Sequence, residues 1–354
     1  MNKESSQVFK GNIFLFYSYD VGDDIELTEV REKNLVKERL FALSPFFKHY
    51  NIPLSFDLQL EDDQAGECVI SKAYRFGVLS FCFKISFEES FENLKLKLID
   101  IHEVYRKKAD DFAKKTFDKV LPAIEHPNFY HLKNSYYVVN VMPSTEEKVR
   151  PEAFREKYGD TIASLLRLET TRLSEFQKRE ILSATTGYSG EDFLIIDSEA
   201  SFIYDVEYQE LLEFFELATI KQLQLQYFDM LLDQRLERFY LRPYKIPLKA
   251  YIPLISGRLD QPEQQLARLR VDISVITERL ESSVNLAGDA YFSHVFAILE
   301  KKLSLAEWRR SIDSKLDIIR DLYTVYQHRL ETIHAEMLEV IIVILISIEI
   351  IFSR

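Results

Sequence analysis

The last stretch of the chain carries its densest apolar run. Residues 337–354 read MLEVIIVILISIEIIFSR, and between positions 340 and 352 only Ser347 and Glu349 are polar. Because exposed apolar surface of this extent drives association, the run must be covered by a bilayer, by another chain or by the protein's own core. The run therefore constrains the architecture more than it constrains any reaction.

Two apolar rows repeat every seven residues through the helix that precedes this run and continue into it. One row holds Leu305, Ile312, Ile319, Tyr326, Ile333 and Val340. The other row holds Leu316, Tyr323, Leu330, Met337, Ile344 and Ile351. This pattern predicts one long helix, either in an antiparallel bundle within the chain or at a seam shared between subunits.

Composition limits the class of protein. The chain has 354 residues, 47% of them hydrophobic, which indicates a folded protein with more than one core. Its net charge of −12 argues against non-specific DNA or RNA binding, and no DNA partner is expected. The two cysteines, Cys68 and Cys82, are too few for a disulfide framework or a zinc site and indicate a reducing compartment.

The N-terminal half alternates β-rich runs with amphipathic stretches. Strands are predicted at 13–17, 54–58, 75–87 and 136–141, and helices at 28–50, 91–124 and 151–169. Two apolar runs at 193–197 and 200–204 predict a β-hairpin. The order predicts an α+β protein with an N-terminal split-βαβ (ferredoxin-like) α/β domain over residues 1–205.

The C-terminal half reads as long helices with a coiled-coil-like pattern. One helix is predicted from about 207 to Pro243, one after Pro262, a short one at 290–303, and the last from Leu305 onward. These helices form a predicted helical domain at 206–339, followed by a hydrophobic tail at 340–354.

The end of the last helix also carries a short motif. Leu338, Glu339 and Glu349, with the aliphatic residues between them, resemble the C-terminal signature of the family named "required for meiotic nuclear division". That resemblance implies an oligomeric, membrane-associated factor linked to organellar translation, with a ribosome-associated partner. That family is catalytically uncharacterised, so the resemblance points to no catalytic residue.

The length of the apolar run decides which membrane roles are open to it. Residues 340–352 would form a helix about 20 Å long, whereas the hydrocarbon core of a bilayer is about 30 Å thick. We weigh a short or tilted transmembrane anchor, a buried oligomer core and a core helix within the chain. The residues concerned are Leu338, Glu339, Val340, Ile341, Ile342, Val343, Ile344, Leu345, Ile346, Ile348, Glu349, Ile350, Ile351 and Phe352.

The N-terminus has neither the apolar core of a signal peptide nor an Arg-rich transit pattern. The expected location is therefore a membrane surface facing the cytoplasm, or the mitochondrial inner membrane in a eukaryote.

Motifs of known chemistry are missing from the sequence. None of the seven histidines has the spacing of a metal pair, and no phosphate-binding or nucleophile loop occurs, so no metal, cofactor or catalytic residue is predicted. The polar loop at 185–192 (TTGYSGED) is either a plain turn or an anion cradle. Asp229 and Asp233 lie one helical turn apart and are expected to pair with Arg235 and Arg238.

A basic and aromatic stretch marks the end of the helix before Pro243. It contains Arg235, Arg238, Arg242 and Lys245. This mixture suits phospholipid headgroups or stacked RNA bases, and it also suits ordinary packing at a helix end.

These observations predict a non-enzymatic, self-associating and membrane-associated scaffold or tethering protein, with itself and membrane lipid as partners. An enzyme with a site near 185–192 and a pore-forming assembly are the alternatives.

Overall fold

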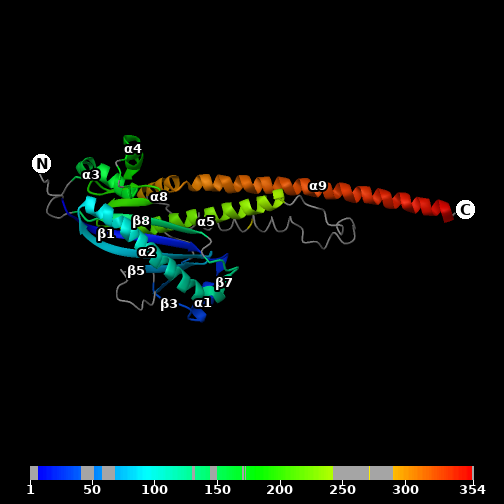
Figure 1. The fold of residues 1–354 in the computed structure, drawn as a ribbon, viewed down its shortest axis with the longest axis horizontal. Coiled ribbons are helices and arrows are strands. Elements are labelled where there is room, and N and C mark those ends of the chain that lie inside the picture. Colours follow the sequence, from blue (N-terminus) through cyan, green and yellow to red (C-terminus); the bar gives the residue numbers. More distant parts are fainter. Residues whose placement is uncertain are drawn as a thin grey trace. The chain divides into compact units, whose positions relative to one another are not determined.

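The computed structural model describes residues 7–40, 52–57, 68–129, 132–143, 150–169, 171, 173–241, 271 and 290–352 (Figure 1). The chain divides into two compact units. Unit 1 comprises residues 1–224 and 279–306, and unit 2 comprises residues 225–278 and 307–354. The expected α+β class is confirmed, with an N-terminal sheet and later helices.

A mostly antiparallel sheet forms the centre of unit 1. Its described strands follow the order β3-β4-β5-β6-β1-β8-β11-β10-β9. They are β1 (Phe9–Asp20), β3 (Lys37–Glu38), β4 (Leu54–Asp57), β5 (Cys68–Tyr74), β6 (Val78–Glu89), β8 (Lys133–Val141), β9 (Thr185–Thr186), β10 (Phe193–Ile196) and β11 (Ala200–Tyr204). Two short strands, β2 (Asp24–Ile25) and β7 (Ile124–Glu125), pair with each other apart from this sheet. The predicted hairpin is confirmed as β10 and β11.

The split-βαβ arrangement is not confirmed. Strand β1 is antiparallel to both of its neighbours, β6 and β8. A βαβ unit joins parallel strands through a helix. The parallel pair described in this sheet is instead β8 with β11.

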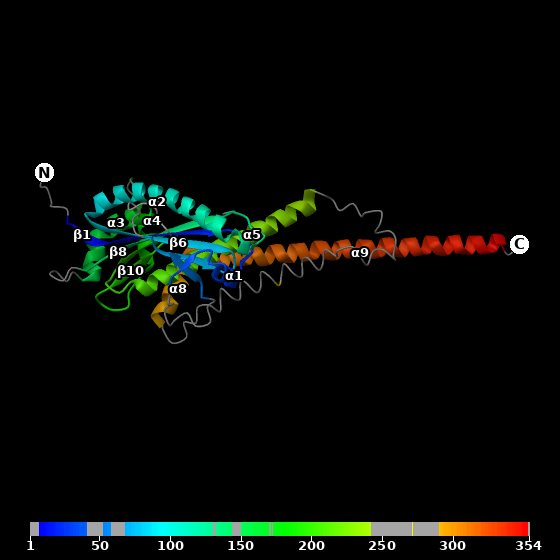
Figure 2. The same cartoon turned by 90° about the horizontal axis from the view of Figure 1, so that it is seen from below.

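Helices cover both faces of the sheet, as Figure 2 shows. On one face lie α2 (Phe91–Val120), α3 (Pro151–Leu166) and α4 (Glu175–Ser183), whose apolar residues share a core cluster with Ile13 and Leu15 of β1. On the other face lie α5 (Gln209–Leu241), through its residues in unit 1, and α8 (Ala290–Lys302). There Tyr136 of β8 stacks on Phe215 of α5, with ring centroids 5.6 Å apart. Alternate residues of each strand therefore enter different cores.

The helix predicted at 28–50 is confirmed only as far as Glu32 and is wrong over residues 33–40. Helix α1 (Leu27–Glu32) is a short helix whose end is marked by Asn34, with φ of 51°. A residue in the left-handed region just after a helix is a common C-terminal signal, and asparagine tolerates it. The chain then enters β3 at Lys37, and residues 41–50 lie outside the described part.

The boundary between β5 and β6 also differs from the expectation. The predicted strand 75–87 begins inside the turn between these strands, where Gly77 has φ of 76°. Strand β5 was not predicted as a separate strand. The α2 helix continues into a 3-10 turn, η1 (Leu121–Ala123), as part of the stretch predicted to be helical.

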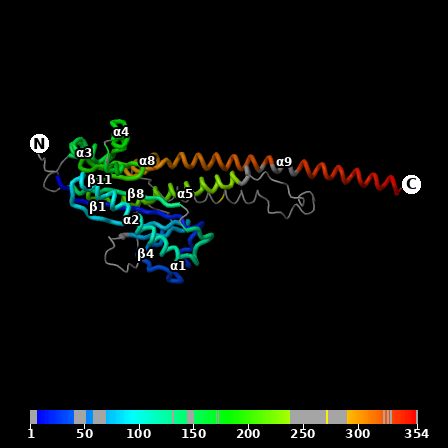
Figure 3. Tube along the Cα trace, in the orientation of Figure 1, coloured from blue at the N-terminus to red at the C-terminus, as the bar shows by residue number. Residues whose placement is uncertain are grey.

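Unit 2 contains the remainder of α5 and nearly all of α9 (Leu305–Phe352), which is one uninterrupted helix (Figure 3). Within this unit, Ser311 Oγ donates to Asp229 Oδ1, and Lys315 Nζ lies 2.6 Å from Asp233 Oδ1. Residue numbers rise together on both helices, so α5 and α9 run parallel rather than antiparallel. Apart from residue 271, which is helical, the helix predicted after Pro262 lies outside the described residues.

Candidate functional site

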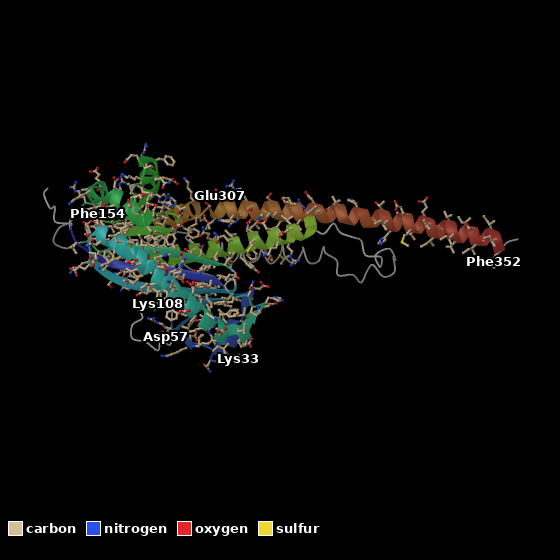
Figure 4. The ribbon with its side chains drawn as sticks, in the orientation of Figure 1. Lys33, Asp57, Lys108, Phe154, Glu307 and Phe352 are labelled. Atoms are coloured by element: carbon tan, nitrogen blue, oxygen red, sulfur yellow. The ribbon has the colours of Figure 1, made fainter. Side chains whose placement is uncertain are left out.

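The C-terminal end of α9 presents an apolar surface on every side of the helix. From Val340 to Ile346 each residue is apolar and at least 40% exposed, and two helical turns of such residues leave no polar face. Beyond the polar positions Ser347 and Glu349, exposure rises to 86% at Phe352 (Figure 4). We call residues 340–352 the apolar segment.

The apolar segment is helical although β-branched residues dominate it. It lacks glycine and proline, and it continues the heptad pattern of the preceding turns. Ser347 Oγ donates to Val343 O at 2.8 Å, so its hydroxyl is satisfied within the helix. An isolated helix of this length is marginal, so its attachment to the longer α9 supports its conformation.

No described helix has the combination of length and hydropathy that a bilayer crossing requires. The expected transmembrane helix is therefore wrong. The reason lies in the charges: extending the apolar segment toward its N-terminus brings in Glu339 and then Glu336. Ionised side chains at the centre of a bilayer are costly.

The basic stretch at the end of α5 is only partly described. Arg235 is half-buried in α5, and Arg238 lies on the same helix. Arg242 and Lys245 lie outside the described residues. The contact surface proposed for these four residues stays a prediction.

Asp229 and Asp233 do form ion pairs, but with a different partner from the expected one. Lys315 of α9 lies 2.8 Å from Asp229 Oδ1 and also contacts Asp233. Side chains of Asp229 and Lys315 are only 13% and 17% exposed. Sequence spacing pointed to cations on the same helix, whereas the observed cation belongs to the neighbouring helix of unit 2.

The polar loop at 185–192 is organised by its own carboxylate. Asp192 accepts hydrogen bonds from the backbone N–H groups of Tyr188, at 2.8 Å, and Ser189, at 2.6 Å. Ser189 Oγ donates to the same carboxylate at 2.5 Å. Thr185 and Thr186 form strand β9. The backbone N–H groups of Tyr188 and Ser189 and the Ser189 hydroxyl are thus engaged by Asp192 and are not available to a substrate anion.

A groove of about 680 Å³ lies between α1, α2 and the β3–β4 end of the sheet. Four of its five charged lining residues form two ion pairs with one another. Arg31 contacts Glu38 at 3.1 Å, and Lys37 approaches Asp57 at 3.8 Å. The groove therefore presents no convergent set of charges for a ligand of one sign.

A row of polar residues crosses the sheet beneath α5. Lys72, Ser80, Ser18 and Asn134 are directly opposite one another on β5, β6, β1 and β8, so their side chains share one face. Glu216 of α5 enters this row: its carboxylate accepts from Lys72 Nζ at 2.5 Å and from Ser80 Oγ at 2.7 Å. Asn134 Nδ2 donates to Gln222 of α5 at 2.7 Å. We call this set the buried polar row.

Asp20 lies two residues beyond the row on β1 and is 2% exposed. Its Oδ1 atom has no hydrogen-bond partner. Burial, with a smaller contribution from the nearby Asp23 charge, raises the pKa of Asp20 to about 8. This carboxyl group is therefore largely protonated at neutral pH.

The described residues contain no group of three or more His, Cys, Asp or Glu side chains that could hold a metal ion. His102 is partly buried, and burial followed by the Arg106 charge lowers its pKa. His126 contacts Asp23 at 3.0 Å on the surface.

Comparison with known proteins assigns the N-terminal unit. Residues 10–210 match the family described as "Uncharacterized protein MJ0711, N-terminal domain". The chain belongs to this family. A relative, "Uncharacterized protein MJ0711" of Methanocaldococcus jannaschii, is 25% identical over 245 residues, which cover 69% of this chain and 73% of the relative. No solved structure shows a significant match.

This family match overturns the resemblance to the "required for meiotic nuclear division" family. The MJ0711 N-terminal domain accounts for β1 to β11 and the start of α5, which is more than half of the chain. The earlier resemblance rested on Leu338, Glu339, Glu349 and the aliphatic residues between them. Such a pattern arises wherever an apolar helix carries two carboxylates, so it is a weak marker of descent. The inferred link to a ribosome-associated partner loses its basis with it.

Proposed function

We propose that this member of the MJ0711 family is a scaffold or tethering protein that attaches to a lipid surface through the apolar segment of α9. Attachment is peripheral, by partial insertion into one face of the bilayer. The observation that carries the proposal is the exposed apolar surface of residues 340–352, which lies on all sides of the helix over residues 340–346. A contiguous exposed surface of this kind marks an interaction site.

Lipid suits this geometry better than a second protein chain does. A helix paired in a coiled coil needs a narrow apolar seam and keeps polar residues on its outer face. Residues 340–346 have no polar face, so a symmetric two-stranded coil would leave about half of them in water. Surrounding hydrocarbon covers every side at once. The competing partner is a second copy of the chain, which the heptad rows predict.

The free energy of partial insertion is modest but favourable. Residues 340–352 contain 11 apolar side chains, and at roughly −0.3 to −0.6 kcal/mol each they contribute about −3 to −7 kcal/mol. Glu349 opposes insertion by up to about 3 kcal/mol if it enters the hydrocarbon ionised. Binding should therefore be reversible, as a peripheral attachment requires.

Flotation of the full-length protein with phosphatidylcholine vesicles tests the proposal. The intact chain should rise with the vesicles, and the variant with both Ile342→Glu and Ile346→Glu should remain below. Val325→Glu is the matched control, because Val325 is an exposed apolar residue of the same helix outside the apolar segment.

The mass of the protein in detergent-free solution shows whether the apolar segment binds a second copy of the chain instead of lipid. One contrary outcome is that the intact chain does not bind vesicles and instead forms oligomers that are absent from the Ile342→Glu/Ile346→Glu variant. In that case the apolar segment binds a second copy of the chain, and the lipid proposal is wrong. If the intact chain does not bind vesicles and is a monomer, neither lipid nor a second copy of the chain binds the apolar segment. The enzyme and pore alternatives stay predictions, and no observation on the described residues favours either.

A further inference from the structure

Charges along the last turns of α9 have one sign. Residues 330–352 contain Glu331, Glu336, Glu339 and Glu349, and no lysine or arginine. All four carboxylates are exposed. Tryptophan and tyrosine, which anchor many helices at a membrane surface, are also missing from this stretch.

Position along the helix decides which of these carboxylates meet the lipid headgroups. At 1.5 Å per residue, Glu339 lies next to the start of the apolar segment and Glu336 about 6 Å before it. Glu331 lies about 13 Å before it, and its Oε2 atom is 3.5 Å from His328 Nδ1. The screening length in physiological salt is about 8 Å. Glu336 and Glu339 therefore feel the charge of a membrane surface strongly, and Glu331 weakly.

We propose that the lipid surface recognised by the apolar segment has no net charge, with zwitterionic headgroups such as phosphatidylcholine. This inference rests on the proposed attachment to lipid. Peripheral helices commonly use lysine and arginine to bind anionic membranes. In this chain the corresponding positions carry carboxylates, which anionic headgroups repel. The net charge of −12 adds a repulsion of the same sign.

The test compares binding of the full-length protein to neutral phosphatidylcholine vesicles and to vesicles with added phosphatidylglycerol. Each carboxylate near an anionic surface should weaken binding about five-fold, equivalent to ~1 kcal/mol. We expect roughly thirty-fold weaker binding to the anionic vesicles from Glu336 and Glu339 together. High salt should narrow this difference because it screens the repulsion.

Charge variants show whether these two residues are responsible. Glu336→Gln with Glu339→Gln should abolish most of the difference, and Glu336→Lys with Glu339→Lys should reverse it. Glu331→Gln, on the same helix but beyond the screening length, should leave the difference nearly unchanged.

Equal binding of the intact chain to both kinds of vesicle, or stronger binding to the anionic kind, overturns this inference while leaving attachment itself in place. Failure to bind any vesicle overturns the proposed function instead. A difference that persists in the double glutamine variant also overturns the assignment to Glu336 and Glu339.

Discussion

Lys72 Nζ of β5 lies 2.5 Å from Glu216 Oε2 of α5, and both residues are buried, with exposures of 2% and 4%. Removing one member of a buried ion pair leaves the other charge without compensation, at a cost of about 3–5 kcal/mol. Glu216→Leu should therefore lower the free energy of unfolding by about that amount in urea denaturation.

The paired change Lys72→Met with Glu216→Leu should be less harmful than Glu216→Leu alone, because no isolated charge remains. The loss in the double variant could instead equal the sum of the losses measured for Lys72→Met and Glu216→Leu separately. The two side chains would then not be energetically coupled, which would contradict a buried ion pair.

Asp20 should make the protein less stable as pH rises. Its pKa in the folded state, about 8, lies above the ordinary value of 3.8. The folded state therefore binds more protons between these values, so stability is full below about pH 4 and declines up to about pH 8. The upper limit of the loss is about 6 kcal/mol.

Comparison with Asp20→Asn isolates this effect from other titrating groups. The variant should lack this part of the pH dependence and exceed the natural protein in stability at pH 8. Urea denaturation of both proteins between pH 5 and 8 provides the measurement. Parallel pH profiles would contradict the burial of an ionisable carboxyl group at this position.

Gly77 should resist substitution. Its φ of 76° lies in the left-handed region, and an added Cβ would lie 1.7 Å from the carbonyl oxygen of Gly22. Gly77→Ala should therefore cost roughly 2–4 kcal/mol, from backbone strain and from displacement of the neighbouring chain. Gly190→Ala is the matched control, because nothing lies within 4 Å of its Cβ position. Thermal denaturation should separate the two variants clearly.

Lys315 should hold α9 against α5 within unit 2. Its ammonium group pairs with Asp229 and Asp233, and Lys315→Met would leave the largely buried Asp229 carboxylate without its cation. We expect a loss of about 1–3 kcal/mol in local stability. Faster amide hydrogen exchange near Ile312 and Leu225, relative to the exposed-pair control Arg320→Met, would reveal it. Unchanged exchange would mean that the ion pair is energetically neutral.

Glu349 should weaken insertion of the apolar segment. It is the charged side chain within residues 340–352, and its neighbours one turn away, Leu345 and Phe352, are apolar. Glu349→Gln removes a charge that is costly in hydrocarbon, so vesicle binding should strengthen several-fold. Glu331→Gln serves again as the control. Unaltered binding of Glu349→Gln would place residue 349 outside the hydrocarbon.

Regular elements with strong periodicity could be predicted from the sequence. Helices α2, α5 and α9 follow from apolar residues at helical spacing, and the β10–β11 hairpin follows from two apolar runs around a short polar pair. The helix at 28–50 was predicted too long because its apolar residues have helical spacing on both sides of Asn34. The left-handed conformation of Asn34 ends α1. Helix α4 was not predicted, since it is short and its buried face is narrow.

The apolar segment was recognisable as an interaction surface from sequence because its residues are consecutive. The buried polar row was not, because Ser18, Lys72, Ser80 and Glu216 come from four elements far apart along the chain. Strand register aligns the first three, and packing of α5 supplies the fourth. Lys315 was missed as the partner of Asp229 for the same reason.

By itself, the sequence determined the long helices α2, α5 and α9, the β10–β11 hairpin and the absence of a polar face over residues 340–346, because these properties depend on neighbours within a few residues. Tertiary structure alone decided the strand order, the parallel packing of α5 with α9, and the burial of Lys72 with Glu216. Those features depend on contacts between distant segments, whose free energies a local pattern does not contain.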